Sequence, residues 1–360
     1  MSAIHSQRRK RLLQELRVRK LEALLVTHPP NWFYLSGFTG ESGALLVSRS
    51  GTTLITDGRF TVQAKAETSG VGIELQAGSL YPSVGAWLKR HGVRRVGYDA
   101  NQLTVAQLHT LKKAAGSKWR GQEASGLVER LRMIKDAQEL AVMRKAAILA
   151  GEVVEGVLKL IKPGVREMEI AAEIEYQMKK RGASGPSFET IVASGPRGAL
   201  PHARPTSKKL RKNELVVLDL GAILAHYCSD MTRTVHLGRA SRRVRDWYRS
   251  VQSAQEAAVA AVKPGVTCGE VDAAAREVLK KNGLDKYFVH STGHGLGLEV
   301  HEDPRVARSQ PVRLEAGNVI TIEPGIYMEG VGGIRIEDDV LVRAGRGEVL
   351  TRVTRDLIEL

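Results

Sequence analysis

The stretch KPGVREMEIAAEIEYQMKKRG, residues 162–182, returns later in the chain as KPGVTCGEVDAAAREVLKKNG, residues 263–283. The two copies align without a gap at an offset of 101 residues, and nine of their 21 positions are identical. Pro-Gly before a helix and Gly after it are common start and stop signals, so two unrelated helices could share them. Gapless agreement over the whole stretch favours an internal duplication.

Each copy precedes the same kind of segment. β-branched runs flank a polar or glycine-rich turn in LVVLDLGAILAHYCSDMTRTVHL (215–237) and in NVITIEPGIYMEGVGGIRIEDDVLV (318–342). Both segments are typical of β-hairpins. The sequence therefore predicts a helix and a hairpin, then a helix and a hairpin again, in a pseudo-twofold repeat. Two similar halves that face each other would enclose one cleft.

The N-terminal part has a different pattern. Short apolar runs alternate with turn signals, which predicts a small α/β domain over residues 1–125. Longer amphipathic helices begin near Asp136, a favourable N-cap residue. We therefore expect an α/β (α+β) protein whose second domain spans residues 126–360. In the first domain the expected strands are residues 23–27, 44–48 and 52–56, and the expected helices lie near residues 5–20, 59–67, 83–91 and 104–115.

Composition limits the classes of function. The 360 residues are 42% hydrophobic and 26% charged, as in ordinary globular proteins. The net charge of +15 would suit nucleic acid, but the basic residues are spread along the chain and only 5% of residues are aromatic. The densest basic cluster, residues 8–20, fits the solvated face of an amphipathic helix. Nucleic-acid binding is therefore disfavoured.

The sequence favours a cytoplasmic protein. No apolar run approaches the roughly 20 residues that span a bilayer, so no membrane partner is expected. The basic N-terminus lacks the apolar core of a secretory signal. Cys228 and Cys268 form no disulfide framework, which fits a reducing compartment.

Four carboxylates occupy matched places in the two hairpins. Asp219 and Asp230 are symmetric about an expected turn at residues 224–225, and Glu323 and Glu337 are symmetric about the centre of the second hairpin. Side chains directly opposite on antiparallel strands share a face, with Cβ atoms about 4.5–5.5 Å apart. Their apolar flanks predict burial. One such acid is most often a satisfied structural carboxylate, but four at paired positions favour a shared function.

Buried carboxylates this close together require protonation or cations. Four of them carry four negative charges, which two divalent cations would balance. His294, in the glycine-rich stretch GHGLGLEVHEDPR (293–305), adds a nitrogen ligand. The set matches a dinuclear metal site.

The motifs DLGA, SDMTRT, GHGLGLEVHE, TIEPGIY and GIRIEDD occur here in that order. Together they resemble the ordered motifs of the "pita-bread" metallopeptidases, the family of methionine aminopeptidase, aminopeptidase P and prolidase. The N-terminal part, with NWFYLSGFTG (31–40) and ITDGRFTVQAKAE (55–67), resembles the additional domain of the Xaa-Pro branch. The resemblance covers the whole chain.

The resemblance implies a ligand set for two metal ions. Asp230 and Glu337 would bridge the ions, Asp219 would bind one of them, and His294 and Glu323 would bind the other. Family resemblance implies Mn²⁺ or Co²⁺. The oxygen-rich set suits Mn²⁺ and leaves Zn²⁺ or Fe²⁺ open.

The resemblance also implies catalytic roles. In the family, water between two metal ions attacks the scissile carbonyl, and Glu323 matches the general acid/base that takes its proton. His301 would donate a hydrogen bond to the carbonyl oxygen, and His290 would line the leaving side of the substrate. His202, in SGPRGALPHARPT (194–206), would contact the substrate. Without the motifs, each histidine would read as an ordinary loop or core residue.

Two further residues match supporting positions. Arg335 lies two residues before Glu337, where a family arginine pairs with a ligand carboxylate; alone it would read as a surface residue of a strand. Tyr327 follows TIEPGI, where the family has a tyrosine in a proton-relay network, although it could simply pack.

Arg305 bears on the choice between two peptidases. Prolidases commonly carry an arginine at this place, where it can bind the terminal carboxylate of a dipeptide. This favours an Xaa-Pro dipeptidase, a homodimer by resemblance, over an aminopeptidase P that acts on longer peptides. The alternative is that HEDPR (301–305) is a turn with a solvated arginine.

Two other classes share this fold. One is a creatinase-like hydrolase that works without metal, and the other is a non-catalytic binding module. Retention of all five ligand positions disfavours both.

Overall fold

The computed structural model describes residues 2–360 and divides into two compact units, Met1–Arg132 and Met133–Leu360. The sequence predicted the boundary at 125/126. The structural division falls later because the helix that follows stays attached to the first unit: Arg132 donates to the side-chain oxygen of Asn31 at 2.7 Å. Among residues 2–360, no helix combines the length and apolar composition that a bilayer-spanning segment requires.

Within residues 2–132 the strands form one six-stranded sheet in the order β4-β3-β2-β1-β5-β6. The three predicted strands are present as β1, β2 and β3, and the four predicted helices as α1, α3, α4 and α5. The bounds are α1 Ser2–Val18, β1 Ala23–Val26, α2 Pro29–Ser36, β2 Ala44–Ser48, β3 Gly51–Thr56, α3 Thr61–Glu67, β4 Gly72–Leu75, α4 Leu80–Arg90, β5 Arg95–Tyr98, α5 Val105–Ala115, β6 Arg120–Glu123 and α6 Leu127–Met133.

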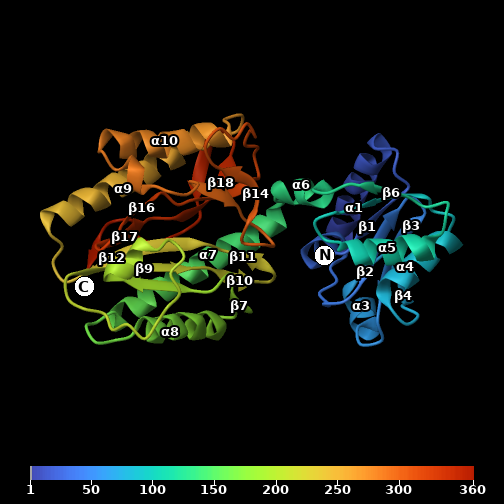
Figure 1. Cartoon of the computed structure of the whole chain (residues 1–360), viewed down its shortest axis with the longest axis horizontal. Coiled ribbons are helices and arrows are strands. Elements are labelled where there is room, and N and C mark those ends of the chain that lie inside the picture. The colour runs from blue at the N-terminus through green and yellow to red at the C-terminus, as the bar shows by residue number, and fades with distance from the viewer. Residues whose placement is uncertain (1) are drawn as a thin grey trace. The chain divides into compact units, whose positions relative to one another are not determined.

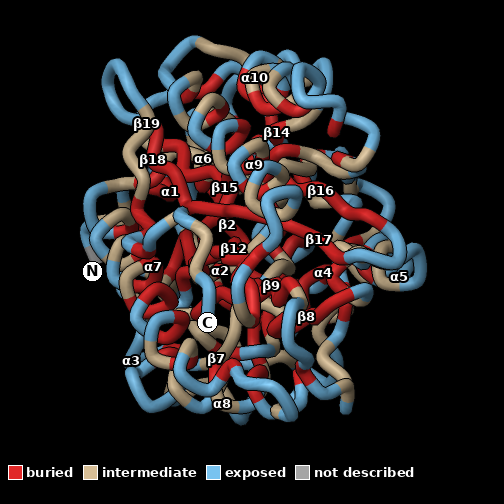
Figure 2. Tube along the Cα trace, turned by 90° about the vertical axis from the view of Figure 1, so that its left-hand side faces the viewer, coloured by how far each residue is buried: buried red, intermediate tan, exposed pale blue. Residues whose placement is uncertain are grey.

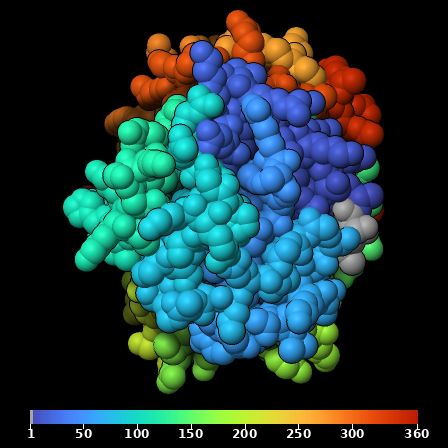
Figure 3. Space-filling view, turned by 90° about the vertical axis from the view of Figure 1, so that its right-hand side faces the viewer, coloured from blue at the N-terminus to red at the C-terminus, as the bar shows by residue number. Residues whose placement is uncertain are grey.

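The sequence missed β4, β5, β6 and α2. Strands β4 (GIEL) and β6 (RGQE) lie at the two edges of the sheet and carry few apolar residues, so no alternating pattern marks them. Helices α4 and α5 supply Val84, Trp87 and Leu111 to the core over the buried central strands. Figure 3 shows the outer surface of this unit, where these helices form part of the light-blue to turquoise area.

In the second unit, strands lie between α9 and α10 on one side and α7 and α8 on the other (Figure 1). The sheets have the orders β11-β10-β7, β20-β12-β9-β8, β14-β13-β15-β18-β19 and β16-β17. The helices are α7 Ala137–Val157, α8 Glu167–Lys180, α9 Arg242–Ala261 and α10 Cys268–Lys281, with short 3₁₀ turns η1 Leu158–Leu160, η2 Gly195–Ala199 and η3 Asp285–Tyr287. The strands are β7 Gly185–Pro186, β8 Ile191–Ser194, β9 Glu214–Leu220, β10 Ala222–Leu224, β11 Tyr227–Cys228, β12 Met231–Leu237, β13 Gly293–Gly295, β14 Glu302–Val306, β15 Val319–Ile322, β16 Gly325–Met328, β17 Gly332–Arg335, β18 Asp338–Arg343, β19 Arg346–Val349 and β20 Ile358–Glu359.

The predicted duplication is visible in the fold. Helices α8 and α10 begin and end at positions that differ by the same offset as the two sequence copies. Gly164 and Gly265, just before them, both have positive φ, 93° and 86°, which favours glycine. Helices α7 and α8 pack on β9 and β12 in one apolar core, and α9 and α10 pack on β15 and β18 in another. Figure 2 shows these strands as buried, whereas α8 and α10 have exposed stretches.

The register of the first hairpin differs from the prediction. Its tip is Ala225 and His226, with φ of 44° and 74°, one residue later than expected. Two successive residues with positive φ form the tight turn that joins antiparallel strands. Asp219 therefore lies opposite Thr232, not Asp230, and the two aspartates are diagonal neighbours.

The second hairpin has the predicted register. Ile322 pairs with Asp338 on one side of the bend, and Gly325 pairs with Arg335 on the other. The same register continues through both pairs, which sets Glu323 opposite Glu337, as the sequence predicted.

Candidate metal centre

Three of the expected metal ligands lie close together. One ligand atom from each of Asp230, His294 and Glu337 lies within 4.8 Å of the others. Asp230 directly precedes β12, His294 lies in β13, and Glu337 directly precedes β18. The centre therefore draws on both halves of the repeat.

His294 has its ring oriented for metal binding. Its Nδ1 donates to the carbonyl oxygen of Gly295 at 2.9 Å, so the lone pair of a neutral ring lies on Nε2. Nε2 is 3.6 Å from an oxygen of Asp230 and 3.6 Å from an oxygen of Glu323. Burial lowers the pKa of His294 to about 4, which keeps the ring neutral and able to coordinate.

One carboxylate oxygen of Asp219 is hydrogen-bonded and the other has no hydrogen-bond partner among the described residues. Arg335 donates to Oδ2 at 2.5 Å, while Oδ1 is buried and has no hydrogen-bond partner among the described residues. A buried carboxylate oxygen without a donor is costly unless a cation binds it. Asp219 therefore fits a metal ligand whose second oxygen is neutralised by Arg335.

The buried carboxylates repel one another electrostatically. Burial raises the pKa of Glu323 to about 8, with a further increase from the charge of Asp219. Burial, together with the neighbouring acids, raises the pKa values of Asp230 and Glu337 well above their usual range. Divalent cations would remove this penalty, so the chemistry of the donor set fits the predicted pair of ions.

His290 belongs to a hydrogen-bonded chain beside the ligands. Its Nδ1 donates to the carbonyl oxygen of Ser291, and its Nε2 accepts from the hydroxyl of Tyr327 at 2.8 Å. The Tyr327 oxygen accepts in turn from Arg335 at 2.6 Å. Burial lowers the pKa of His290 to about 4 and raises that of Tyr327 to about 12, so both are neutral in this chain.

The remaining predicted residues lie near this chain or on the surface. The ring centroids of His301 and His294 are 4.4 Å apart. Burial lowers the pKa of His301, and the charge of His202 lowers it further. Nδ1 of His290 lies 4.0 Å from an oxygen of Glu323. His202 is exposed and follows Pro201, whose carbonyl oxygen accepts from Arg335 at 3.3 Å. Arg305 is exposed on β14.

Two family models match the chain. The model of metallopeptidase family M24 matches residues 141–344, and that of the creatinase/prolidase N-terminal domain matches residues 8–134. The chain belongs to metallopeptidase family M24. The resemblance seen in the sequence motifs is thereby confirmed.

Relatives match this peptidase from end to end. The Xaa-Pro dipeptidase of Pyrococcus horikoshii is 36% identical over 358 residues, which cover 99% of this chain and 99% of the relative. An Xaa-Pro dipeptidase structure from Bacillus anthracis has a TM-score of 0.96 at 38% identity, covering 99% of this chain and 100% of that one. An X-Pro aminopeptidase structure from Thermotoga maritima has a TM-score of 0.90 at 35% identity, covering 96% of this chain and 100% of that one. The peptidase therefore has the pita-bread fold with the additional N-terminal domain.

Sequence reasoning missed the residues that orient the ligands of this peptidase. Thr232 donates to Glu337 at 2.7 Å and accepts from Arg335 at 3.0 Å. The hydroxyl oxygen of Thr321 accepts from the backbone N–H of His294 at 3.1 Å. Both threonines lie two residues from a predicted ligand, on the same face of an extended chain. This two-residue spacing is the sequence signal that could have identified the two threonines.

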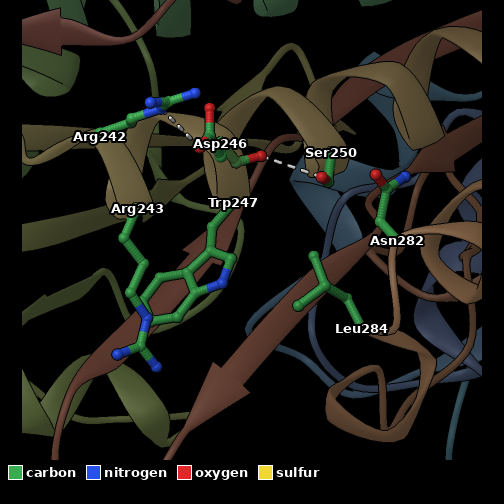
Figure 4. A pocket seen from close by; sticks show the side chains of 7 residues that line it. All are labelled: Arg242, Arg243, Asp246, Trp247, Ser250, Asn282 and Leu284. Atoms are coloured by element: carbon green, nitrogen blue, oxygen red, sulfur yellow. Dashed lines mark hydrogen bonds and ion pairs between the residues drawn. The ribbon is translucent and has the colours of Figure 1, made fainter.

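A hollow on the outer side of the helix layer shares no residue with the metal centre. It is lined by Arg242, Arg243, Asp246, Trp247 and Ser250 of α9 and by Asn282 and Leu284 after α10 (Figure 4). The guanidinium of Arg243 lies 4.3 Å from the centre of the Trp247 ring system, and Asp246 faces Arg242. These basic and acidic groups partly neutralise each other.

Proposed function

We propose that this peptidase cleaves the bond before proline in Xaa-Pro dipeptides. In this proposal the second unit, Met133–Leu360, contains the catalytic domain that the sequence predicted at residues 126–360. The first unit, Met1–Arg132, contains the N-terminal domain predicted at residues 1–125. Two divalent ions are held by Asp219, Asp230, His294, Glu323 and Glu337. The observation that carries the proposal is the convergence of buried carboxylates on Nε2 of His294.

When bound, the two ions would lower the pKa of a water molecule and polarise the scissile carbonyl. The protein supplies the proton acceptor: Glu323 is the proposed general acid/base, and it later returns the proton to the proline nitrogen. Burial raises the pKa of Glu323 to about 8, which supports a role in accepting and returning a proton. His301 donates a hydrogen bond to the carbonyl oxygen as negative charge develops there.

The other residues bind and orient the substrate. The hydrogen-bonded chain of neutral His290, neutral Tyr327 and the Arg335 guanidinium fixes the orientation of these side chains beside the proposed ligands. His202 contacts the peptide. Because the bond before proline has no N–H, recognition relies on these side chains and on the ring rather than on a backbone donor of the substrate.

The proposal also covers the identity of the metal ion, the oligomeric state and the cellular compartment. An oxygen-rich donor set supports Mn²⁺, with Co²⁺ or Zn²⁺ as alternatives. We further propose a cytoplasmic homodimer. Cys228 and Cys268 are both buried free thiols, which agrees with a reducing compartment.

An aminopeptidase P that acts on longer peptides is the second candidate. One observation favours it, the similarity to the X-Pro aminopeptidase structure from Thermotoga maritima, and the exposure of Arg305 does not decide between the two candidates. An exposed arginine could bind the carboxylate of a dipeptide or remain in solvent.

The deciding experiment compares hydrolysis of Ala-Pro and Ala-Pro-Ala by Mn²⁺-loaded and chelator-treated protein. Metal-dependent cleavage of the dipeptide alone supports the dipeptidase, and Arg305→Ala should then raise its KM selectively. Preference for the tripeptide supports the aminopeptidase. Failure to cleave either peptide with metal bound would overturn the proposal.

A further inference from the structure

Glu167, the first residue of α8, is a buried acid that the proposed chemistry does not use. Glu167 has 0% of its surface exposed to solvent. Oε1 accepts from the backbone N–H and the hydroxyl of Ser194, at 2.9 and 2.8 Å. Oε2 accepts from the backbone N–H and the hydroxyl of Thr206, at 3.1 and 2.8 Å, and from Nε of Arg197 at 3.0 Å.

These partners lie at both ends of one segment, residues 194–206. Oε1 accepts from Ser194 at the beginning of the segment, and Oε2 accepts from Thr206 at its end and from Arg197. A single side chain therefore links both ends of the loop. Helix α8 adds two contacts, because the backbone N–H groups of Glu167 and Met168 donate to the carbonyl oxygens of Lys208 and Thr206. A carboxylate at a helix N-terminus is also favoured by the helix dipole.

The closed loop contains His202 and packs against residues next to the candidate metal centre. The carbonyl oxygen of Pro201 accepts from Arg335 at 3.3 Å. A Cβ on Gly333 would lie 2.0 Å from the carbonyl oxygen of Gly198, so the loop backbone packs directly on strand β17. The position of the loop therefore fixes where His202 stands relative to Arg335.

We propose that Glu167 is a positioning residue that holds the loop 194–206 closed and so sets His202 against the substrate. The inference rests on the proposed function for the role of His202. The carboxylate is required for a geometric reason. Glutamine has one acceptor oxygen, and its amide would face a backbone N–H of either Ser194 or Thr206, which can only donate. One end of the loop would then lose its hydrogen bond to this side chain and be held less firmly.

The test uses Glu167→Gln in the full-length, Mn²⁺-loaded protein. We expect kcat/KM on the cleaved Xaa-Pro peptide to fall by about 10- to 100-fold, as for a misplaced binding group. The matched control is Glu169→Gln, which removes an exposed charge from the same helical turn and should keep the wild-type rate. Mn²⁺ affinity should stay unchanged in both variants.

A double-mutant cycle separates positioning from general damage. If Glu167 acts through His202, the variant with both Glu167→Gln and His202→Ala is no slower than His202→Ala alone. Losses that multiply, or a Glu167→Gln variant with wild-type kinetics, would overturn the inference.

Amide hydrogen exchange tests the loop without turnover. Peptides within residues 195–205 should exchange faster in Glu167→Gln than in the wild type or in Glu169→Gln, and unchanged exchange there would refute the clamp. If Glu167→Gln does not fold, Thr206→Val removes one hydroxyl donor and should give a smaller change in the same direction. A wild type that cleaves neither peptide would overturn the proposed function, and hydrogen exchange would still decide whether Glu167 closes the loop.

Discussion

At the residue scale, hydrogen bonds from the protein itself orient the proposed ligands. Glu337 is held by Thr232, His294 by Gly295, and the backbone of Asp230 by a carboxylate oxygen of Asp339 at 3.2 Å. The remaining cost is electrostatic, because the buried acids favour their protonated forms. Metal ions and protons therefore compete for the same oxygens.

This competition predicts how metal affinity depends on pH. In the metal-free protein Glu323 has a pKa of about 8, so below that pH a metal must displace its proton. Affinity for Mn²⁺ should therefore rise with pH through about 8, by about tenfold per pH unit for each proton displaced. Titration calorimetry from about pH 6 to about pH 9, in buffers of different ionisation enthalpy, measures both affinity and proton release. A flat affinity and no proton release would contradict the raised pKa.

Thr232 provides a second test at this scale. Thr232→Val keeps the shape of the side chain but removes the hydroxyl that joins Glu337 to Arg335. Loss of a group that orients a ligand typically lowers metal affinity by about 10- to 100-fold, and calorimetry with Mn²⁺ would measure the change.

The matched control for this variant is Thr190→Val. The Thr190 hydroxyl is buried and has no hydrogen-bond partner within the described part of the chain, so its loss should leave affinity unchanged. Equal affinities for Thr232→Val and the wild type would remove Thr232 from the centre.

At the element scale, hairpin register decides which carboxylates meet. In the second hairpin the glycines at the tip, among them Gly330 with a φ of 74°, mark the turn in the sequence. In the first hairpin the turn residues are Ala225 and His226, and alanine gives no signal of a positive φ. The predicted turn was therefore one residue early, and Asp219 was set opposite the wrong partner.

Helix α7 begins where the sequence predicts, and its cap can be tested. Asp136 accepts from the backbone N–H groups of Gln138 and Glu139 at 2.9 and 3.0 Å. Asp136→Ala should lower the free energy of unfolding by about 1 kcal/mol, since two donors of the first turn lose their acceptor. Chemical denaturation measures the change. Gln138→Ala, an exposed substitution in the same turn, should stay near the wild type; equal stability of the two variants would argue against the cap.

At the scale of the second unit, the two halves of the repeat are joined behind the metal centre. Arg233 of β12 donates to Asp338 of β18 at 2.7 Å, and it also donates to the carbonyl oxygens of Glu337, Val353 and Thr354. The side chains of Arg233 and Asp338 are 1% and 0% exposed. One guanidinium therefore connects a strand from each half with the C-terminal segment.

Removal of Arg233 should weaken the whole unit. Arg233→Met leaves Asp338 with Gln255 and Arg355 as its polar partners, and breaking a buried pair of this kind costs about 3–5 kcal/mol. Denaturant unfolding of the metal-free protein measures the loss. Arg249→Met, at an exposed arginine of α9, is the control and should change stability little. A loss as small as in the control would show that the halves are held together elsewhere.

The sequence by itself determined the repeat and the second hairpin, and it singled out the proposed ligand residues. Each of these follows from local order: helix signals at a fixed offset, glycines at a turn, and motifs with constant spacing. It also placed β1, β2 and β3, which are short apolar or β-branched runs. It did not reveal the edge strands β4 and β6, since pairing with a neighbour, not their own side chains, makes them strands. The tertiary structure alone decided that Asp219 faces Thr232, that Thr232 and Thr321 hold the ligands, and that Glu167 closes the loop of His202. Those relations join residues far apart in the chain, and only packing and shared hydrogen bonds bring them together.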